Sequence, residues 1–339
     1  MYLGYAVLML CRTTVGIAGP AMLLDPDLNL DKTAFGAIIG WGTAGNLVGK
    51  LTNGVLADRI GGNKIFILAI TVSALAIFCF GNTSNIDAFF LFYFITIFAK
   101  SAGWPSMANI IKVWFTRSKH GRVWGIIATS SRTGSVAATL LLGSLLLIMS
   151  WRGLFYVAAF ITILIALLLF KFLRVSRSDI TVSSLESDET TNLLSTWTLN
   201  HLLNELETFD SLIFFFKNAH FWLISLSVTV LAVLFEFQVF IPVYLNESFG
   251  LIPAQAGIAS AAFPMGCLVA VFVGGFIFDR LSKKSLIFVL GGMLVLAFAC
   301  LLLLWLLVST DSNSQIALAL TIGTILYLAL PSHLRFTYP

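Results

Sequence analysis

The chain has 339 residues, of which 58% are hydrophobic and only 11% are charged, and its formal net charge is +4. Soluble domains carry about 25% charged residues, and the mean hydropathy here is +0.96. This composition excludes the ordinary soluble class and indicates an integral membrane protein for which no nucleic-acid partner is expected. The four cysteines all fall inside apolar runs, so they indicate neither a disulfide framework nor a metal site.

Apolar runs long enough to cross a bilayer recur along the whole chain. A spanning helix needs about 20 mostly apolar residues, and the Gly, Ser and Thr residues inside these runs suit helices that pack closely. The predicted spans are 2–22, 34–57, 65–81, 87–113, 123–148, 153–173, 219–245, 254–278, 285–308 and 315–331. We therefore predict an all-α polytopic membrane protein with about ten transmembrane helices.

The segment between the sixth and seventh spans has a different composition. It contains the polar run Ser183-Ser-Leu-Glu-Ser-Asp-Glu-Thr-Thr191 and few long apolar stretches. We interpret 1–173 as a six-helix bundle, 174–214 as a cytoplasmic linker and 215–339 as an incomplete second bundle of about four helices. The linker also contains Asp188-Glu-Thr-Thr-Asn-Leu-Leu194, which fits an acidic dileucine sorting signal and equally fits a solvated charge run.

The distribution of Lys and Arg predicts the orientation in the membrane. With the N-terminus in the cytoplasm, the opposite side holds only Lys32 and Arg152. The cytoplasmic connections then hold Arg59, Lys64, Lys112, Arg117, Lys119, Arg122, Lys171, Arg174, Arg177, Lys217, Arg280, Lys283 and Lys284. This positive-inside bias places the N-terminus in the cytoplasm. Two candidate glycosylation sequons, at Asn82 and Asn246, both fall on the opposite side. The sequence leaves open whether the membrane is the plasma membrane or an endolysosomal or vacuolar one.

Two stretches about 220 residues apart are nearly the same: Gly54-Val-Leu-Ala-Asp-Arg-Ile-Gly-Gly-Asn-Lys64 and Gly274-Gly-Phe-Ile-Phe-Asp-Arg-Leu-Ser-Lys-Lys284. Each closes one apolar run and opens the next, as expected of two halves built from the same bundle. Both stretches resemble the loops after the second and eighth helices of the major facilitator superfamily. The resemblance implies a gating motif formed by Gly54, Asp58, Arg59, Gly61, Asp279 and Arg280.

In that family the loop acts as a latch that joins the cytoplasmic ends of the helices. A carboxylate at Asp58 can face a helix terminus and pair with a basic residue, whereas the alternative is a solvated turn charge. Ser282 stands where the second copy would have glycine. The family has twelve spans, so the chain is expected to be shortened at its C-terminal end.

Five ionisable residues are expected at membrane depth: Arg12, Lys50, Lys100, Arg132 and Glu236. Such residues are energetically costly in a bilayer and are functional-site candidates by default. In carriers of this architecture they line a cavity between the halves. The alternative is a structural role, in which each side chain bonds to a neighbouring backbone or reaches the interface.

A closer resemblance is carried by Gly4-Tyr-Ala-Val-Leu-Met-Leu-Cys-Arg12, Gly49-Lys-Leu-Thr-Asn-Gly54, Gly103-Trp-Pro105 and Trp114-Phe-Thr-Arg-Ser-Lys-His-Gly121. These are similar to the organophosphate:phosphate antiporter family. The resemblance implies that Arg12 holds the substrate phosphate and that Lys50 lies near the same cavity. A guanidinium suits this role because its planar fork of donors matches phosphate or carboxylate oxygens.

The second half departs from that family. The antiporters carry a second arginine in the seventh helix, where this chain has only Glu236 and Gln238, and Arg132 has no counterpart. A cluster of cations facing one carboxylate would also suit a carboxylated or zwitterionic substrate, with Glu236 as a proton-coupling site.

The function predicted from these residues is secondary transport of a small organic anion, phosphorylated or carboxylated, by alternating access. The lipid bilayer, the anion and a coupled proton or phosphate are the expected partners. The alternative is a shortened, transport-incompetent paralogue that acts as a receptor or membrane subunit. No motif indicates an enzyme, a cofactor or a metal site.

Overall fold

The computed structural model describes residues 1–116, 120–173, 222 and 236–278, with short stretches between 292 and 325. Every regular element in these stretches is helical. The N-terminal half contains α1 (Tyr2–Leu23), α2 (Lys32–Ile60), α3 (Gly62–Asn82), α4 (Ile86–Ser101), α5 (Gly103–Trp114), α6 (His120–Leu145) and α7 (Trp151–Phe172). The described part of the second half contains η3 (Phe237–Val239), α12 (Ile241–Phe249), α13 (Pro253–Ala259) and α14 (Ala262–Phe278).

The helix boundaries follow the predicted spans, with additional breaks at prolines. The predicted span 87–113 is divided into α4 and α5 at Ala102. The span 254–278 is likewise divided into α13 and α14. A proline cannot donate a hydrogen bond to the carbonyl four residues earlier. Pro105 and Pro264 lie four residues after Ser101 and Ser260, so each break has a local cause.

Local sequence also explains how α2 begins and ends. The Asp31 carboxylate caps the helix by accepting a hydrogen bond from the backbone N–H of Ala34 at 2.7 Å. At the other end, Gly61 has a φ of +103°, which strongly favours glycine. The tight turn expected at Gly61-Gly62 is therefore present, and it returns the chain directly into α3.

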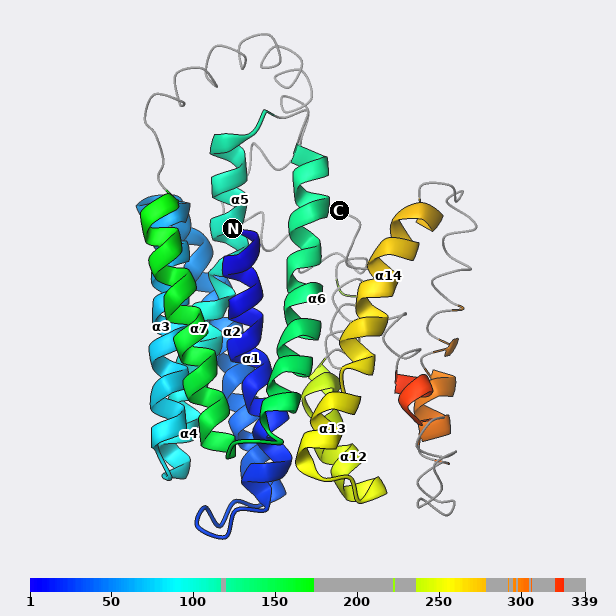
Figure 1. Ribbon diagram of the computed structural model, residues 1–339. Helices are drawn as coiled ribbons and strands as arrows, with labels where there is room; N and C mark the ends of the chain where they lie inside the picture. Colours follow the sequence, from blue (N-terminus) through cyan, green and yellow to red (C-terminus); the bar gives the residue numbers. More distant parts are fainter. Residues whose placement is uncertain are drawn as a thin grey trace.

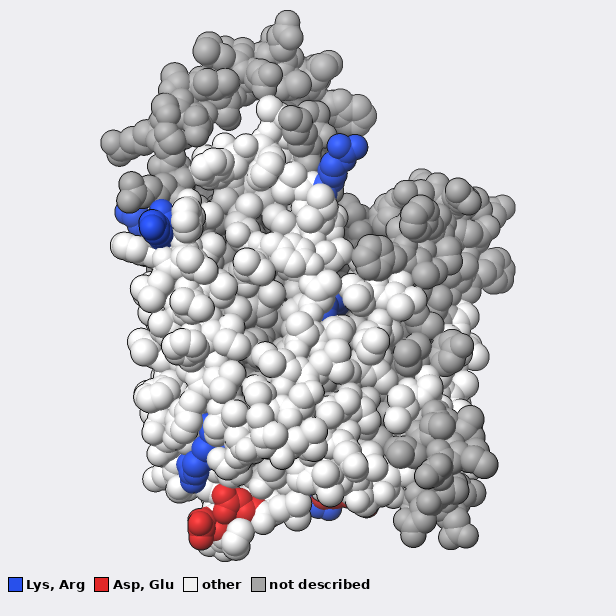
Figure 2. All heavy atoms as spheres, in the orientation of Figure 1, with Lys and Arg blue, Asp and Glu red and all other residues white. Residues whose placement is uncertain are grey.

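Five helical segments of the described part are long and apolar enough to cross a membrane: Tyr2–Leu23, Gly62–Asn82, Ile86–Trp114, Trp151–Phe172 and Pro253–Val271. In Figure 2 the visible middle of the molecule is almost without charged side chains, and acidic side chains gather at one end. That end carries the loop between α1 and α2 (Figure 1) and is called the distal end below. The opposite end, where α1 begins, is called the N-terminal end. The chain is an integral, multi-pass membrane protein.

Helix α1 forms the centre of the N-terminal half, with Leu8, Cys11 and Val15 fully buried. It packs closely against α6, since a Cβ added to Gly134 would lie 2.7 Å from the Cα of Ala6. Close packing of this kind is typical of membrane helices whose contacts are made by small residues. It leaves one face of α1 directed towards the second half.

In the described part of the chain, the contacts between the two halves lie mainly towards the distal end. There Gly16 of α1 packs against Val239, and Gly143 of α6 packs against Ile258. Towards the N-terminal end, α6 and α14 diverge (Figure 1). The described part of the molecule is therefore joined at the distal end and wider at the N-terminal end.

Several predictions fall outside the described residues. The linker 174–214 is one of them, so the domain boundaries at 173 and 214 stay predictions. Asp279 and Arg280 of the second gating copy also lie outside, as do most of the predicted spans 285–308 and 315–331.

Candidate functional site

The site is centred on Arg12, in the middle of α1, and on Glu236, which directly precedes η3. A guanidinium nitrogen of Arg12 donates a hydrogen bond to a Glu236 carboxylate oxygen at 2.8 Å. The side chains are 12% and 33% exposed, respectively, so the pair is largely withdrawn from solvent. Arg12 belongs to the first half and Glu236, 224 positions later, to the second half, so this ion pair connects the two halves of the molecule.

Lys100 lies in the last turn of α4 and belongs to the same region. Arg12, Lys100 and Glu236 line one pocket, together with Tyr93, Asn46 and other residues of α2 and α4. This pocket encloses about 250 Å³ of space, part of it open to solvent. Two cations of the first half and one carboxylate of the second half therefore surround a common space.

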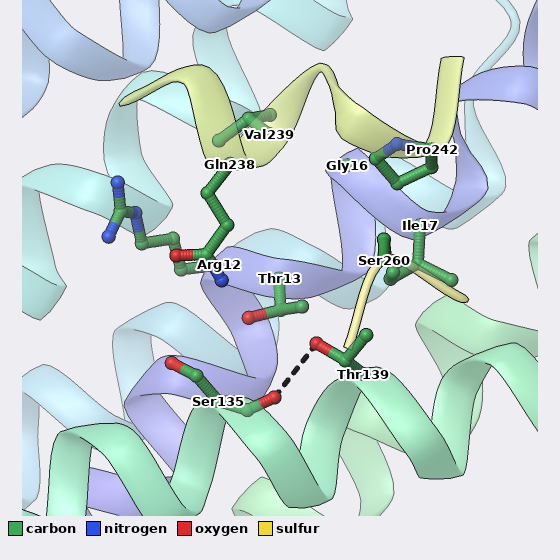
Figure 3. A pocket seen from close by; sticks show the side chains of 10 residues that line it. All are labelled: Arg12, Thr13, Gly16, Ile17, Ser135, Thr139, Gln238, Val239, Pro242 and Ser260. Atoms are coloured by element: carbon green, nitrogen blue, oxygen red, sulfur yellow. Dashed lines mark hydrogen bonds between the residues drawn. The ribbon is translucent and has the colours of Figure 1, made fainter. Parts of the chain in front are cut away.

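A second pocket is also lined by Arg12 and encloses about 380 Å³, again partly open to solvent. Its polar lining comes from Thr13 of α1, Ser135 and Thr139 of α6, Gln238 of η3 and Ser260. In Figure 3 the Arg12 guanidinium points away from Ser135 and Thr139, while Gln238 and Thr13 lie between them. Arg12 thus stands between a charged pocket and a pocket lined by hydroxyl groups.

The other two predicted cations lie at the margin of this site. Lys50 is exposed on α2, and Arg132 on α6 is half-buried and donates a hydrogen bond to the Ser131 hydroxyl. Neither lines the two pockets, although both lie within electrostatic range of Lys100. Their role in substrate binding stays a prediction.

The first copy of the gating motif lies at the N-terminal end. Asp58 and Arg59 are exposed in the last turn of α2, and Gly54 lies one turn before them. The Asp58 carboxylate accepts a hydrogen bond from the Asn109 side chain of α5 at 2.9 Å. This contact joins two helices of the same half, and the latch between the halves stays a prediction.

The two candidate glycosylation sites occupy different environments near the distal end. Asn82 is the exposed last residue of α3. Asn246 is half-buried within α12, where its amide nitrogen donates a hydrogen bond to the Leu251 carbonyl at 2.6 Å. Use of either site is untested.

The sequence reasoning missed the hydroxyl lining of the second pocket. Ser135 and Thr139 are four residues apart in an apolar span, which places both on one face of a helix. This spacing could have indicated the pocket, because polar residues that repeat on one face of an apolar helix can line a polar cavity. Within the described residues, no group of three or more His, Cys, Asp or Glu is placed to hold a metal ion.

Comparison with known proteins identifies the family. The model of the Major Facilitator Superfamily matches residues 1–335, nearly the whole chain. The chain belongs to the Major Facilitator Superfamily. This membership confirms the fold class predicted from the repeated Asp-Arg loops and from the apolar spans.

Similar proteins within the superfamily agree with the resemblance seen in the first half. A probable hexose phosphate transport protein of Chlamydia trachomatis is 25% identical, and the match covers 84% of this chain and 64% of that protein. The glycerol-3-phosphate transporter of Bacillus subtilis is 23% identical, over 96% of this chain and 74% of that protein. The membrane sensor protein UhpC of Salmonella typhimurium is also 23% identical, with the same coverage. These relatives confirm the predicted similarity to organophosphate:phosphate antiporters.

Solved structures of the superfamily share the fold. A bacterial homolog of the human lysosomal transporter Spinster, in an inward-facing and occupied conformation, matches with a TM-score of 0.72 and 16% identity. The match covers 99% of this chain and 72% of that structure. The chain spans only 64% of the length of the Chlamydia relative.

Proposed function

We propose that the protein is a carrier, rather than an enzyme, that moves small phosphorylated or carboxylated organic anions across a membrane by alternating access. The observation that carries this proposal is the largely buried Arg12, which faces Glu236 across the two halves at 2.8 Å. A guanidinium in a cavity with little water is a strong, bidentate binding group for an anion. Lys100 supplies a second positive group in the same pocket.

Glu236 would compete with an anionic substrate for Arg12. In the described conformation its carboxylate occupies the Arg12 guanidinium, so an arriving anion competes for the same donors. Displacement of Glu236 breaks a contact between the halves, which links anion binding to movement of one half against the other. A released carboxylate can then take up a proton, and a coupled proton or phosphate would supply the driving force.

The positive-inside bias supports an orientation with the N-terminal end in the cytoplasm. In a background in which the four native cysteines are replaced, a cysteine at exposed Lys64 should react with a membrane-impermeant maleimide only from the cytoplasm, and one at exposed Asp27 only from outside. The reverse result would overturn the orientation.

The central test is anion binding by the purified chain. Arg12→Ala should weaken the binding of n-propyl phosphate or propionate by roughly ten- to a hundredfold, the value of a charge-assisted hydrogen bond. Arg122→Ala removes an exposed arginine of α6 and should leave the affinity unchanged. If a folded Arg12→Ala variant binds every anion as well as the parent does, the organic-anion proposal fails.

A receptor is the second candidate function. It is favoured by the similarity to a membrane sensor protein, which covers as much of this chain as the transporter match does. Uptake into proteoliposomes separates the two candidates. Anion accumulation supports the carrier, whereas Arg12-dependent binding without uptake supports the receptor.

A further inference from the structure

The pocket that Arg12 shares with Glu236 contains a second cation, Lys100. Lys100 is half-buried in the last turn of α4 and lines the pocket together with the ion pair. In the described part of the chain, its ammonium group makes neither a hydrogen bond nor an ion pair. Among the residues that line the two described pockets, Glu236 is the only carboxylate. Two cations therefore share one carboxylate, and Arg12 holds it at 2.8 Å.

Binding of an anion at Arg12 would leave Glu236 in need of a new partner. The anion takes guanidinium donors that the carboxylate occupies in the described conformation. A carboxylate largely withdrawn from water is destabilised when its partner is removed, unless it gains a proton or another cation. Lys100 can supply that cation, because it lines the same pocket and lies within electrostatic range of Glu236.

The two cations differ in the geometry of the contacts that they form. The Arg12 guanidinium is a planar fork, which matches the paired oxygens of a phosphate or carboxylate ligand. A lysine ammonium is a compact charge on a flexible stem, and its three donors can rotate. It can therefore bind a carboxylate without a fixed angle of approach. This difference suits Arg12 as the anchor for a ligand and Lys100 as an adaptable partner for a protein side chain.

An exchange of partners would also change the contact between the two halves. Arg12 lies in the middle of α1, whereas Lys100 lies at the end of α4. Transfer of the Glu236 carboxylate would replace a contact with α1 by a contact with α4. The segment that begins at Glu236 would then be held in both states, but by different helices. Anion binding would therefore favour one position of this segment over another.

We propose that Lys100 is the alternative partner of Glu236, so that an anion binding to Arg12 transfers the carboxylate from Arg12 to Lys100. The inference rests on the proposed anion site and deepens it, because it gives the two cations different roles. Arg12 contacts the ligand, whereas Lys100 is a positioning residue that acts through Glu236. The alternative is that Lys100 contacts the anion directly, beside Arg12.

A double-mutant cycle on ligand affinity distinguishes these two roles. The probe is n-propyl phosphate, titrated calorimetrically into the purified full chain. Lys100→Met removes the charge and should weaken binding about tenfold or more, the value of the hydrogen bond between charged groups that Glu236 then cannot form. In the Glu236→Gln background, the same substitution should change the affinity less than about threefold, because no carboxylate remains to be transferred.

Lys112→Met is the matched control for the loss of a positive charge. Lys112 is an exposed lysine in the last turn of α5, and it lines neither pocket. Its substitution should leave the affinity unchanged in both backgrounds. If Lys100→Met does not fold, Lys100→Gln takes its place, with the same expected dependence on Glu236.

The outcomes distinguish this inference from the proposed function. An equal or larger loss in the Glu236→Gln background would show that Lys100 contacts the anion directly, and no loss in either background would show that it takes no part. Both results would overturn the exchange and leave the anion site standing. A similar loss in Lys112→Met would also overturn it, because the effect would then follow from overall charge. If the parent chain binds neither n-propyl phosphate nor propionate, the anion function fails and the exchange fails with it. A loss that depends on Glu236, with Lys112→Met unchanged, supports the exchange.

Discussion

In the described part of the chain, two ion pairs join the N-terminal half to the segment 236–249, and both have a nitrogen–oxygen distance of 2.8 Å. Arg12–Glu236 lies at the middle of α1, with side chains 12% and 33% exposed. Lys32–Glu247 lies at the distal end, with side chains 72% and 40% exposed. Equal geometry is thus combined with very different access to water.

The difference in solvent exposure indicates which ion pair can act as a switch. Charges exposed to water gain little from pairing, because the solvent stabilises them equally well when apart. Charges withdrawn from water depend on their partner, and removal of one partner leaves the other uncompensated. Arg12 therefore needs a carboxylate or an anionic ligand, whereas Lys32 needs neither. We therefore expect the inner pair, and not the outer pair, to couple ligand binding to contact between the halves.

The two residues of the inner pair should be strongly coupled energetically. A double-mutant cycle with Arg12→Ala and Glu236→Gln should give a coupling energy of about 1.5–3 kcal/mol, the range for a hydrogen bond between charged groups. The measurement is the free energy of unfolding in mixed detergent micelles. Additive single-mutant effects would contradict the prediction, because they would show that the contact contributes no coupling.

The carboxylate of Glu236 should also lower the affinity of the site for anions. Glu236→Gln removes the carboxylate that competes for Arg12, so n-propyl phosphate should bind roughly tenfold more tightly. If Glu236 carries a coupled proton, accumulation driven by an imposed pH gradient should also be lost. Glu247→Gln makes the same change in the outer pair and should alter neither quantity. Unchanged or weaker binding of n-propyl phosphate in Glu236→Gln would contradict the competition between Glu236 and the anion for Arg12.

The membrane helices were largely predictable because their signal is local. Apolar runs place α1 at Tyr2–Leu23 against a predicted span of 2–22, and Gly61 marks the turn between α2 and α3. Pro105 was interpreted as a kink residue, but the division of the spans beside Pro105 and Pro264 was not predicted. Proline removes one hydrogen bond, but whether a helix then bends or divides depends on the helices packed against it.

The centre of the site was predictable only as a set of separate residues. The cost of burying a charge identifies Arg12 and Glu236 individually. Their pairing depends on the rotation of α1 against the second half, which sequence periodicity does not specify.

The hydrogen-bond partners of Arg152 were likewise not predictable from the sequence. Arg152 is one of two basic residues predicted on the non-cytoplasmic side. It donates hydrogen bonds to the carbonyls of Gly81 and Thr83 at 3.0 and 2.9 Å, which ties α7 to the end of α3.

The outer pair should have a much smaller effect than the inner pair. A cycle with Lys32→Ala and Glu247→Gln should give a coupling energy of about 0.5 kcal/mol or less. Raising the ionic strength to about 1 M, where the Debye length is about 3 Å, should remove it. The inner cycle should change much less with salt. A salt-resistant coupling in the outer pair as large as in the inner pair would end the distinction drawn between them.

A hydrogen-bonded carboxylate at the distal end should contribute a small, pH-dependent part of the stability. The indole N–H of Trp151 donates to Asp25 at 2.8 Å, and this bond holds the pKa of Asp25 below its usual value. A lowered pKa in the folded state contributes stability above the unfolded pKa of about 3.9, and that contribution is lost as the pH falls through the folded pKa.

Trp151→Phe removes the donor, so it should destabilise the protein at neutral pH through the loss of packing and of the hydrogen bond. The difference in apparent Tm between parent and variant should then narrow between about pH 5 and pH 3. In an Asp25→Asn background, the same difference should not depend on pH. A difference that stays constant or widens on acidification would show that the contact between Trp151 and Asp25 does not favour the ionised carboxylate.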